Sequence, residues 1–324
     1  MAISLQEAKV GMRDHIAAGV INEFQQDSLL LDRLVFDNAV AAGGSGSTLV
    51  YGYQQVQTPA VAGVRAINAE YTAGEAKRVE KTAKCIIMGG KFQLDRVIIG
   101  TAGEVDELDF QTRQKVQATA NEFHMITING TAAASGAGYI VNTFDGLKKL
   151  LNGTANEFTS EVDISTSAKL DANGQALLDE LDKLIAYVPG CNMILMNLQM
   201  LLKVRSAARR AGYYERTKDD FGRFVETYNG IPMVDVGKYF NGTAEVDVIP
   251  VDNTGKTDIY AVAIGLDGFH GISPQGDKIV RTYMPDLNAP GAVKEGEVEL
   301  IAGVALKNSK KAGVLKGVQI SANA

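Results

Sequence analysis

The sequence predicts an α+β protein in which a compact body carries extended appendages, and three observations lead to this class. Residues 48 to 99 have strand-like composition, with interleaved charges and few large apolar side chains. The next segment has the spacing of one long helix that ends at Gly130. Residues 166 to 280 then alternate amphipathic helices with short apolar strands, which is the pattern of a packed α/β region.

The N-terminal segment, residues 1 to 47, predicts an arm built from short helices. Ser4 and Glu7 have the spacing of a capping box, which marks a helix start. A second helical stretch runs from Ile21 to Leu34, with apolar contacts expected at Phe24, Leu30, Leu31 and Leu34. The run GGSGS at Gly43 to Ser47 predicts a hinge, because glycine is free in its backbone angles and the run offers few packing atoms.

The segment from 48 to 99 predicts a long hairpin that projects from the body. Its strand-like residues have too few apolar anchors to form a core of their own, so another chain would have to stabilise it. Gly89 and Gly90 interrupt the strand CIIMGGKFQLDRVII, which suggests a bulge or kink. The alternative interpretation is a solvated loop in a monomeric protein.

The segment after the hairpin predicts a single helix of about 30 Å. Asp106, Glu107 and Asp109 place negative charge at its N-terminus, and Gly130 supplies a stop. Its apolar residues recur at helical spacing but are sparse, which is typical of a strut.

The compact region has clear start and stop signals. One apolar helix face from Leu177 to Val188 ends at Pro189-Gly190, and the run CNMILM predicts a strand that is covered on both sides. Asn197 caps a helix that Gly212 ends, and Asn229-Gly230 predicts a tight turn into the strand IPMVDV. Further strands are predicted at AEVDVIPV and DIYAVAI, and one or two closing strands at GEVELIAGVALKNSKKAGVLKGVQI.

The sequence offers no recognisable catalytic, cofactor or metal site. The histidines, His15, His124 and His270, are far from one another and from both cysteines, and the glycine-rich runs lack the spacing of phosphate or dinucleotide loops. Cys85 and Cys191 are predicted to be reduced thiols. There is no apolar run long enough for a membrane span and no signal peptide, so a cytoplasmic product is expected.

The net charge of −6 argues against a protein whose main function is to bind nucleic acid, because such domains are usually basic. Two basic groups leave alternatives open. One comprises Lys203, Arg205, Arg209 and Arg210, and the other comprises Lys307, Lys310, Lys311 and Lys316. Each group is either a contact with packaged DNA or with acidic groups of a neighbouring subunit, or a solvated face.

The order of these elements resembles the major capsid protein of tailed bacteriophages, the fold named for phage Hong Kong 97. EFQQDSLLLDRLVF resembles the arm before the hairpin, and AEYTAGEAKRVEKTAKCIIMGGKFQLDRVI resembles the extended loop and its return. DFQTRQKVQATANEFHMITINGT resembles the spine helix. AGYYERTKDDFGRFVETYNGIPMVDVG and DIYAVAIGLDGFHGISP resemble the axial domain, and PDLNAPGAVKEGEVELIAGVALKNSKKAGVLKGV resembles the C-terminal part.

The resemblance implies an α+β Hong Kong 97-like fold with five parts. These are an N-terminal arm at 1–47, an extended loop at 48–99, a peripheral domain with the spine helix at 100–165, an axial domain at 166–280, and returning strands of the peripheral domain at 281–324. Because the arm begins almost at Met1, a separate scaffold protein, or none, is expected rather than a fused one.

The function that the resemblance implies is structural and not enzymatic, without cofactors. The chain would assemble in the bacterial host cytoplasm into pentamers and hexamers of an icosahedral virion capsid that encloses double-stranded DNA, alongside scaffold, portal and decoration proteins. It would lie near packaged DNA without reading its sequence, and would not contact membrane. An encapsulin-like nanocompartment shell is the alternative; an α/β enzyme would need a clustered titratable site that is not recognisable here.

The hairpin supplies the candidate assembly residues. Each is charged or aromatic and lies in the segment that lacks apolar anchors. They are Arg65, Glu70, Tyr71, Glu75, Lys77, Arg78, Glu80, Lys81 and Lys84.

Overall fold

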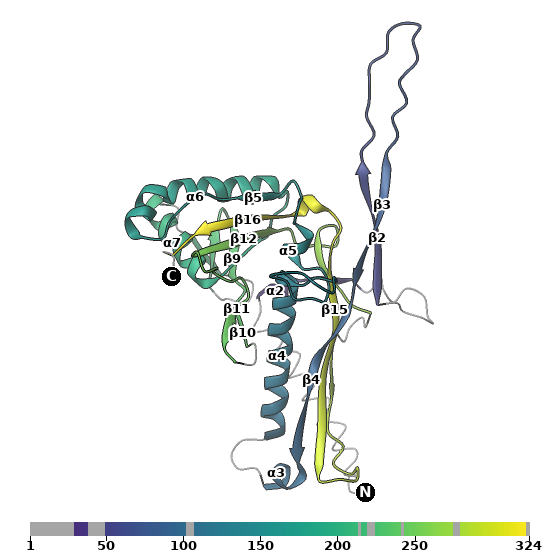
Figure 1. The fold of residues 1–324 in the computed structure, drawn as a ribbon, viewed down its shortest axis with the longest axis vertical. Helices are drawn as coiled ribbons and strands as arrows, with labels where there is room; N and C mark the ends of the chain where they lie inside the picture. Colours follow the sequence, from purple (N-terminus) through teal and green to yellow (C-terminus); the bar gives the residue numbers. More distant parts are fainter. Residues whose placement is uncertain are drawn as a thin grey trace.

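The computed structural model describes residues 29–37, 49–101, 107–212, 215–218, 224–240, 243–274 and 279–321. It has the α+β architecture that the sequence predicts: a two-stranded hairpin projects from the body, a long helix runs beside paired strands, and a second sheet carries two further helices (Figure 1). The predicted helix at Ser4 and the GGSGS hinge lie outside the described residues. Within the predicted stretch 21–34, a short helix α2 (Leu29–Arg33) buries Leu30 and Leu31, and Leu34, which follows the helix, is buried too.

A five-stranded sheet is organised around the longest strand, β15 (Val293–Leu306). On one side β15 pairs antiparallel with β4 (Ile86–Asp95) along the whole of β4. Its other partners are β14 (Val280–Tyr283) and β13 (Phe269–Ile272), and β13 also pairs in parallel with β1 (Phe36–Asp37).

The predicted bulge at Gly89-Gly90 is wrong, because the register between β4 and β15 runs unbroken through both glycines. Gly89 instead permits a close approach of two backbones. A Cβ atom at this position would lie 1.9 Å from the Val298 carbonyl oxygen, and the Gly89 φ of 149° favours glycine. A second close approach occurs on the neighbouring strand β15, where a Cβ atom at Gly296 would lie 2.4 Å from the Phe92 ring.

The predicted long helix is confirmed as α4 (Glu107–Asn129), which follows the short helix α3 (Arg96–Thr101) and lies along β4 and β15 (Figure 1). Val116, Ala120 and Phe123 face the core. Gly130 follows the helix as expected, but its backbone is not left-handed. Its Cβ would collide with the Phe144 and Ile126 carbonyl oxygens at 2.5 and 2.6 Å, so the glycine allows tight packing rather than a C-cap.

The second sheet has seven strands. In spatial order they are β5 (Glu157–Thr159), β16 (Ala312–Gln319), β12 (Lys256–Val262), β6 (Met193–Met196), β9 (Ile231–Asp235), β8 (Phe224–Tyr228) and β7 (Glu215–Lys218). The run CNMILM forms the central strand β6, which is wholly buried as predicted. Asn229 and Gly230 form the predicted two-residue turn between β8 and β9, both with positive φ.

Two helices cover this sheet and contact each other, α6 (Ser167–Tyr187) and α7 (Leu198–Ala211). The α6 helix begins earlier than its apolar face suggests, because Thr166 caps it by accepting a hydrogen bond from the Lys169 amide. The predicted cap of α7 is confirmed: Asn197 accepts from the Met200 amide at 2.8 Å, and Gly212 ends the helix with φ 80°.

The hydrophobic core is divided between these two layers. One cluster includes Phe123, Val298 and Leu300 and joins α4, β4 and β15 to one face of the seven-stranded sheet. Another lies under α6 and α7 and includes Leu181, Met200 and Ile259. Smaller elements complete the described chain. These are α5 (Leu147–Leu150), the pair β10 (Lys238–Phe240) and β11 (Glu245–Asp247), and the 3-10 turn η2 (Ser309–Lys311).

Candidate assembly interface

The projecting hairpin consists of β2 (Val50–Thr58) and β3 (Lys77–Lys84), joined by an extended segment from 59 to 76 (Figure 1). Every residue of that joining segment is exposed. The apolar side chains Val61, Val64 and Ile67 are 78%, 104% and 92% exposed. These side chains bury almost no surface against their own chain, so they do not stabilise it. Exposed apolar groups of this kind are typical of a surface that binds another molecule.

The predicted assembly residues all lie on this hairpin, but the structure brings only a few of them together. Arg65 lies 5.4 Å from the Tyr71 ring centroid and donates to the Ala69 carbonyl at 3.2 Å, which closes a local turn. Glu70 and Glu75 are exposed in the joining segment. Lys77, Arg78, Glu80, Lys81 and Lys84 lie along β3.

Within the described part of the chain, none of these predicted residues forms an ion pair. Arg78 donates to the Gln54 side chain at 3.3 Å, across the two strands of the hairpin. The charged side chains of β3 therefore remain available for a partner.

The base of the hairpin is held by a cluster that sequence reasoning missed, made of Asp37, Tyr51, His270 and Lys307, which we call the latch. The Tyr51 hydroxyl donates to the Asp37 carboxylate at 3.0 Å. The Lys307 ammonium lies 3.5 Å from that carboxylate and 5.4 Å from the centroid of the Tyr51 ring. Gln55, also on β2, donates to the Leu306 and Lys307 carbonyls at 3.2 and 2.5 Å.

The latch joins four elements that meet only in the folded chain. Asp37 ends β1, Tyr51 lies on β2, His270 lies on β13, and Lys307 follows β15. Burial raises the pKa of Tyr51, and the neighbouring Asp37 carboxylate raises it further, so the phenol stays protonated as the donor. The arrangement ties the root of the hairpin to the five-stranded sheet while the tip stays uncovered.

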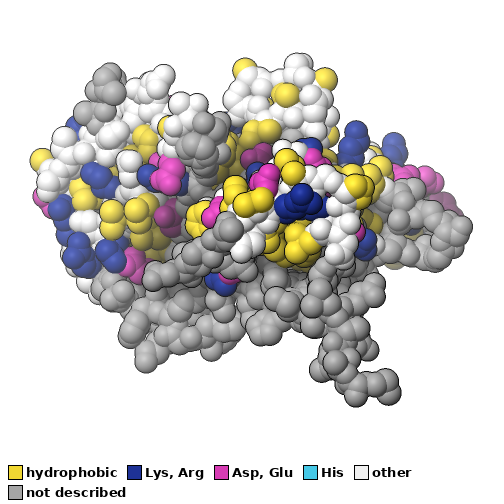
Figure 2. Space-filling view, turned by 90° about the horizontal axis from the view of Figure 1, so that it is seen from below, with side chains coloured by type: hydrophobic (Ala, Val, Ile, Leu, Met, Phe, Trp, Pro, Cys, Tyr) yellow, Lys and Arg dark blue, Asp and Glu magenta, His cyan; other side chains and the backbone are white. Residues whose placement is uncertain are grey.

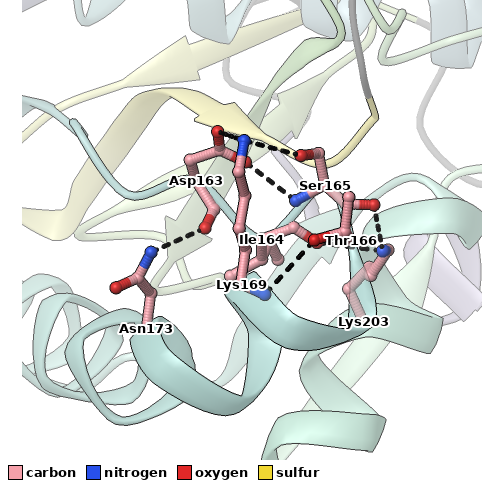
Figure 3. Close-up of polar contacts among 7 residues, drawn as sticks. All are labelled: Asp163, Ile164, Ser165, Thr166, Lys169, Asn173 and Lys203. Carbon is pink, nitrogen blue, oxygen red and sulfur yellow. Dashed lines mark hydrogen bonds and ion pairs between the residues drawn. The ribbon is translucent and has the colours of Figure 1, made fainter.

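The basic residues of α7 are mostly engaged by groups of their own chain. Figure 3 shows the Lys203 ammonium directed at the Ile164 and Ser165 carbonyl oxygens, at 2.9 and 3.1 Å. Beside it, Asp163 accepts from the Lys169 ammonium at 2.5 Å, and its backbone carbonyl accepts from Asn173. These bonds fasten the segment before α6 to both helices.

Two other basic side chains of α7 are also engaged within the chain. Arg205 pairs with Glu226 and Arg210 pairs with Asp171, whereas Arg209 is exposed. In the C-terminal group, the Lys311 ammonium nitrogen lies 3.6 Å from a carboxylate oxygen of Asp267, and the Lys316 ammonium nitrogen lies 2.5 Å from a carboxylate oxygen of Glu157. Lys and Arg side chains still gather at the edge of the molecule where α6 and α7 lie (Figure 2), yet much of this charge is neutralised by carboxylates of the same chain.

A cleft of about 470 Å³ lies between α4 and β4. Lys115, Thr119 and Glu122 are its polar residues on the helix. Burial raises the pKa of Glu122. Among the described residues no three histidine, cysteine, aspartate or glutamate side chains gather as a metal site would require, and no helix is long and apolar enough to cross a membrane. Cys85 and Cys191 are free, as predicted.

Comparison with known proteins identifies the fold. No protein-family profile and no curated protein matches the sequence. Solved structures do match over nearly the whole chain. The SrpI encapsulin complex of Synechococcus elongatus has a TM-score of 0.57 at 16% identity, covering 90% of this chain and 87% of that one.

The capsid of Myoviridae phage XM1 matches with a TM-score of 0.55 at 12% identity, covering 90% of this chain and 91% of that one. A virus-like particle from Pyrococcus furiosus matches with a TM-score of 0.52 at 10% identity, covering 93% and 98%. The chain therefore has the Hong Kong 97-like capsid fold that the resemblance implied.

Proposed function

We propose that the chain is the subunit of a self-assembling shell, and more closely the major capsid protein of a tailed bacteriophage. It would form pentamers and hexamers of an icosahedral head around double-stranded DNA and perform no catalysis. Scaffold, portal and decoration proteins would be its partners. The five parts of the chain would keep their order, with corrected bounds at two strands: β4 pairs with β15 in the five-stranded sheet instead of belonging to the projecting loop, and β16 pairs with β12 in the seven-stranded sheet instead of with the peripheral part.

The observation that carries this proposal is the uncovered hairpin. Its joining segment exposes Val61, Val64 and Ile67 and leaves the charges of β3 unpaired within the described chain. Such a segment does not stabilise an isolated subunit, whereas in a closed assembly each of its contacts recurs around every symmetry axis. The fold shared with solved capsid and encapsulin structures supports the same reading.

The test replaces residues 59–76 by a two-residue Asn-Gly turn. Because Thr58 and Lys77 are partners in the β2–β3 ladder, the shortened hairpin can still pair. We expect an unchanged melting temperature and the loss of closed particles in electron micrographs. Normal particle yield would show that the hairpin is not needed for assembly. A much lower melting temperature would show that the hairpin belongs to the folded core.

A milder pair of variants provides the matched control. Val64→Ser with Ile67→Ser changes two exposed residues of the hairpin, while Leu266→Ser changes an exposed residue of similar size in the turn before β13. We expect the hairpin variant to lower particle yield and the control to leave it unchanged. Equal losses of particle yield in the two variants would show that the hairpin tip has no special role in assembly.

A nanocompartment shell is the second candidate, favoured by the encapsulin match at a TM-score of 0.57. The two candidates differ in what the particle encloses. Particles recovered from the organism that carries the gene should contain double-stranded DNA, protected from nuclease, if the chain is a phage capsid protein. A co-purifying protein cargo without such DNA would favour the nanocompartment.

A further inference from the structure

His270 occupies the innermost position of the latch. Its side chain is fully buried, and the ring packs edge-on against Tyr51, with centroids 5.9 Å apart and planes at 78°. The Nδ1 atom lies 3.3 Å from the Gly268 carbonyl oxygen, so Nδ1 carries the proton and donates there. The Nε2 atom is buried and finds no hydrogen-bond partner among the residues that the structure describes.

The groups that face His270 come from every neighbouring element of the latch. β1 contributes the Asp37 carboxylate, β2 contributes the Tyr51 phenol, and the residue after β15 contributes the Lys307 ammonium. The adjoining residues on β13 itself, Phe269 and Gly271, carry no charge. Asp37 is already shared between the Tyr51 hydroxyl and Lys307.

A proton added to Nε2 would therefore create a buried cation without an acceptor, next to an existing ammonium. Burying an unpaired charge is strongly unfavourable, so the surroundings move to bring the charge into contact with water or an acceptor. Tyr51 packs against the ring, and its displacement would let water reach Nε2. Since Tyr51 and Gln55 fasten β2 beside the end of β15, loss of the Tyr51 contact would leave the Gln55 bonds to hold the base of the hairpin, which would then be freer to change its angle.

We propose that the latch is a proton-operated hinge, in which uptake of one solvent proton by His270 Nε2 detaches Tyr51 from Asp37 and frees the hairpin to change its angle. Its importance for assembly rests on the proposed shell function, whereas the hinge itself does not. The direction of the pH effect follows from the environment. Burial lowers the pKa of His270, the hydrogen bond to the Gly268 carbonyl raises it, and the Lys307 charge lowers it more than the Asp37 carboxylate raises it. The net pKa lies below the ordinary value, so the closed latch holds at neutral pH and weakens as pH falls below the ordinary range of histidine.

The experiment measures the hairpin angle directly. Spin labels are placed at Val64→Cys on the hairpin and Tyr187→Cys at the end of α6, in a Cys85→Ala, Cys191→Ala background, and labelled chains are diluted with unlabelled ones. Distance distributions are recorded by double electron–electron resonance at about pH 8 and about pH 5, on either side of the ordinary histidine range. We expect a reversible shift or broadening at the lower pH.

His270→Gln should keep one distribution at both pH values, because glutamine does not titrate. His124→Gln and His15→Gln should respond as the parent does. Tyr51→Phe keeps the ring but loses the bond to Asp37, so it should broaden the distribution already at about pH 8. An unchanged parent distribution, or an equal response in His270→Gln, would overturn the hinge. Absence of particles at every pH would instead count against the shell function, and the distance measurement would still decide the hinge.

Discussion

His124 on α4 should make the stability of the spine helix region depend on acid. Its side chain is 6% exposed, and burial lowers its pKa from 6.5 to about 4. The unfolded chain thus takes up a proton near pH 6.5, while the folded chain resists it until about pH 4. The stability that neutral His124 contributes is complete above 6.5 and is lost as pH falls through this window. At about 1.4 kcal/mol for each pH unit, the loss in unfolding free energy is about 3 kcal/mol.

The assay is urea unfolding at a series of pH values across that window, followed by far-ultraviolet circular dichroism because the chain has no tryptophan. His124→Gln removes the titrating ring and keeps a polar group in its place. We expect the unfolding free energy of the variant to fall by about 3 kcal/mol less than that of the parent between the two ends of the window. Parallel pH profiles for both proteins would refute the reasoning.

Three further substitutions or treatments test the packing. Phe123→Ala should lower the unfolding free energy by about 3–5 kcal/mol, since the ring is fully buried; a loss under about 1 kcal/mol in urea unfolding would contradict this. Asn197→Ala should cost about 2 kcal/mol, because it removes the α7 cap and the donor to the Ile249 carbonyl, and an unchanged melt would exclude that role. Burial raises the pKa of the Cys85 thiol to about 11, so iodoacetamide should modify Cys85 slowly in the native protein and quickly in urea; equal rates by mass spectrometry would show the site is open.

Much of the fold could be predicted because its signals are local. The Asn197 cap and the Gly212 stop lie within one helix, and the apolar run of β6 is continuous. The hairpin could be recognised because large apolar residues between 48 and 84 are few and dispersed, too few to form a core of its own. Such features need only neighbours along the chain. The hairpin nevertheless ends at Lys84 and not at the predicted residue 99, because β4 pairs with β15 in the five-stranded sheet.

The latch and the glycine contacts could not be predicted, because they depend on residues far apart in sequence. Asp37 and Lys307 are 270 positions apart, and neither belongs to a motif. Gly89 reads as a bulge until the backbone of β15 is placed against it. The basic residues of α7 likewise look like a charged face until Glu226 and Asp171 are brought to them by the fold.

The β4–β15 ladder has a mechanical consequence for a chain whose hairpin is pulled by a neighbour. β15 continues for 14 residues, about 46 Å at about 3.3 Å per residue, from the end of the molecule near α3 to the hairpin root. Tension along this direction acts parallel to the strands, so the whole ladder resists at once instead of opening one hydrogen bond at a time. The subunit would then stretch little along this axis and yield first at the latch, where a few side-chain contacts carry the strain.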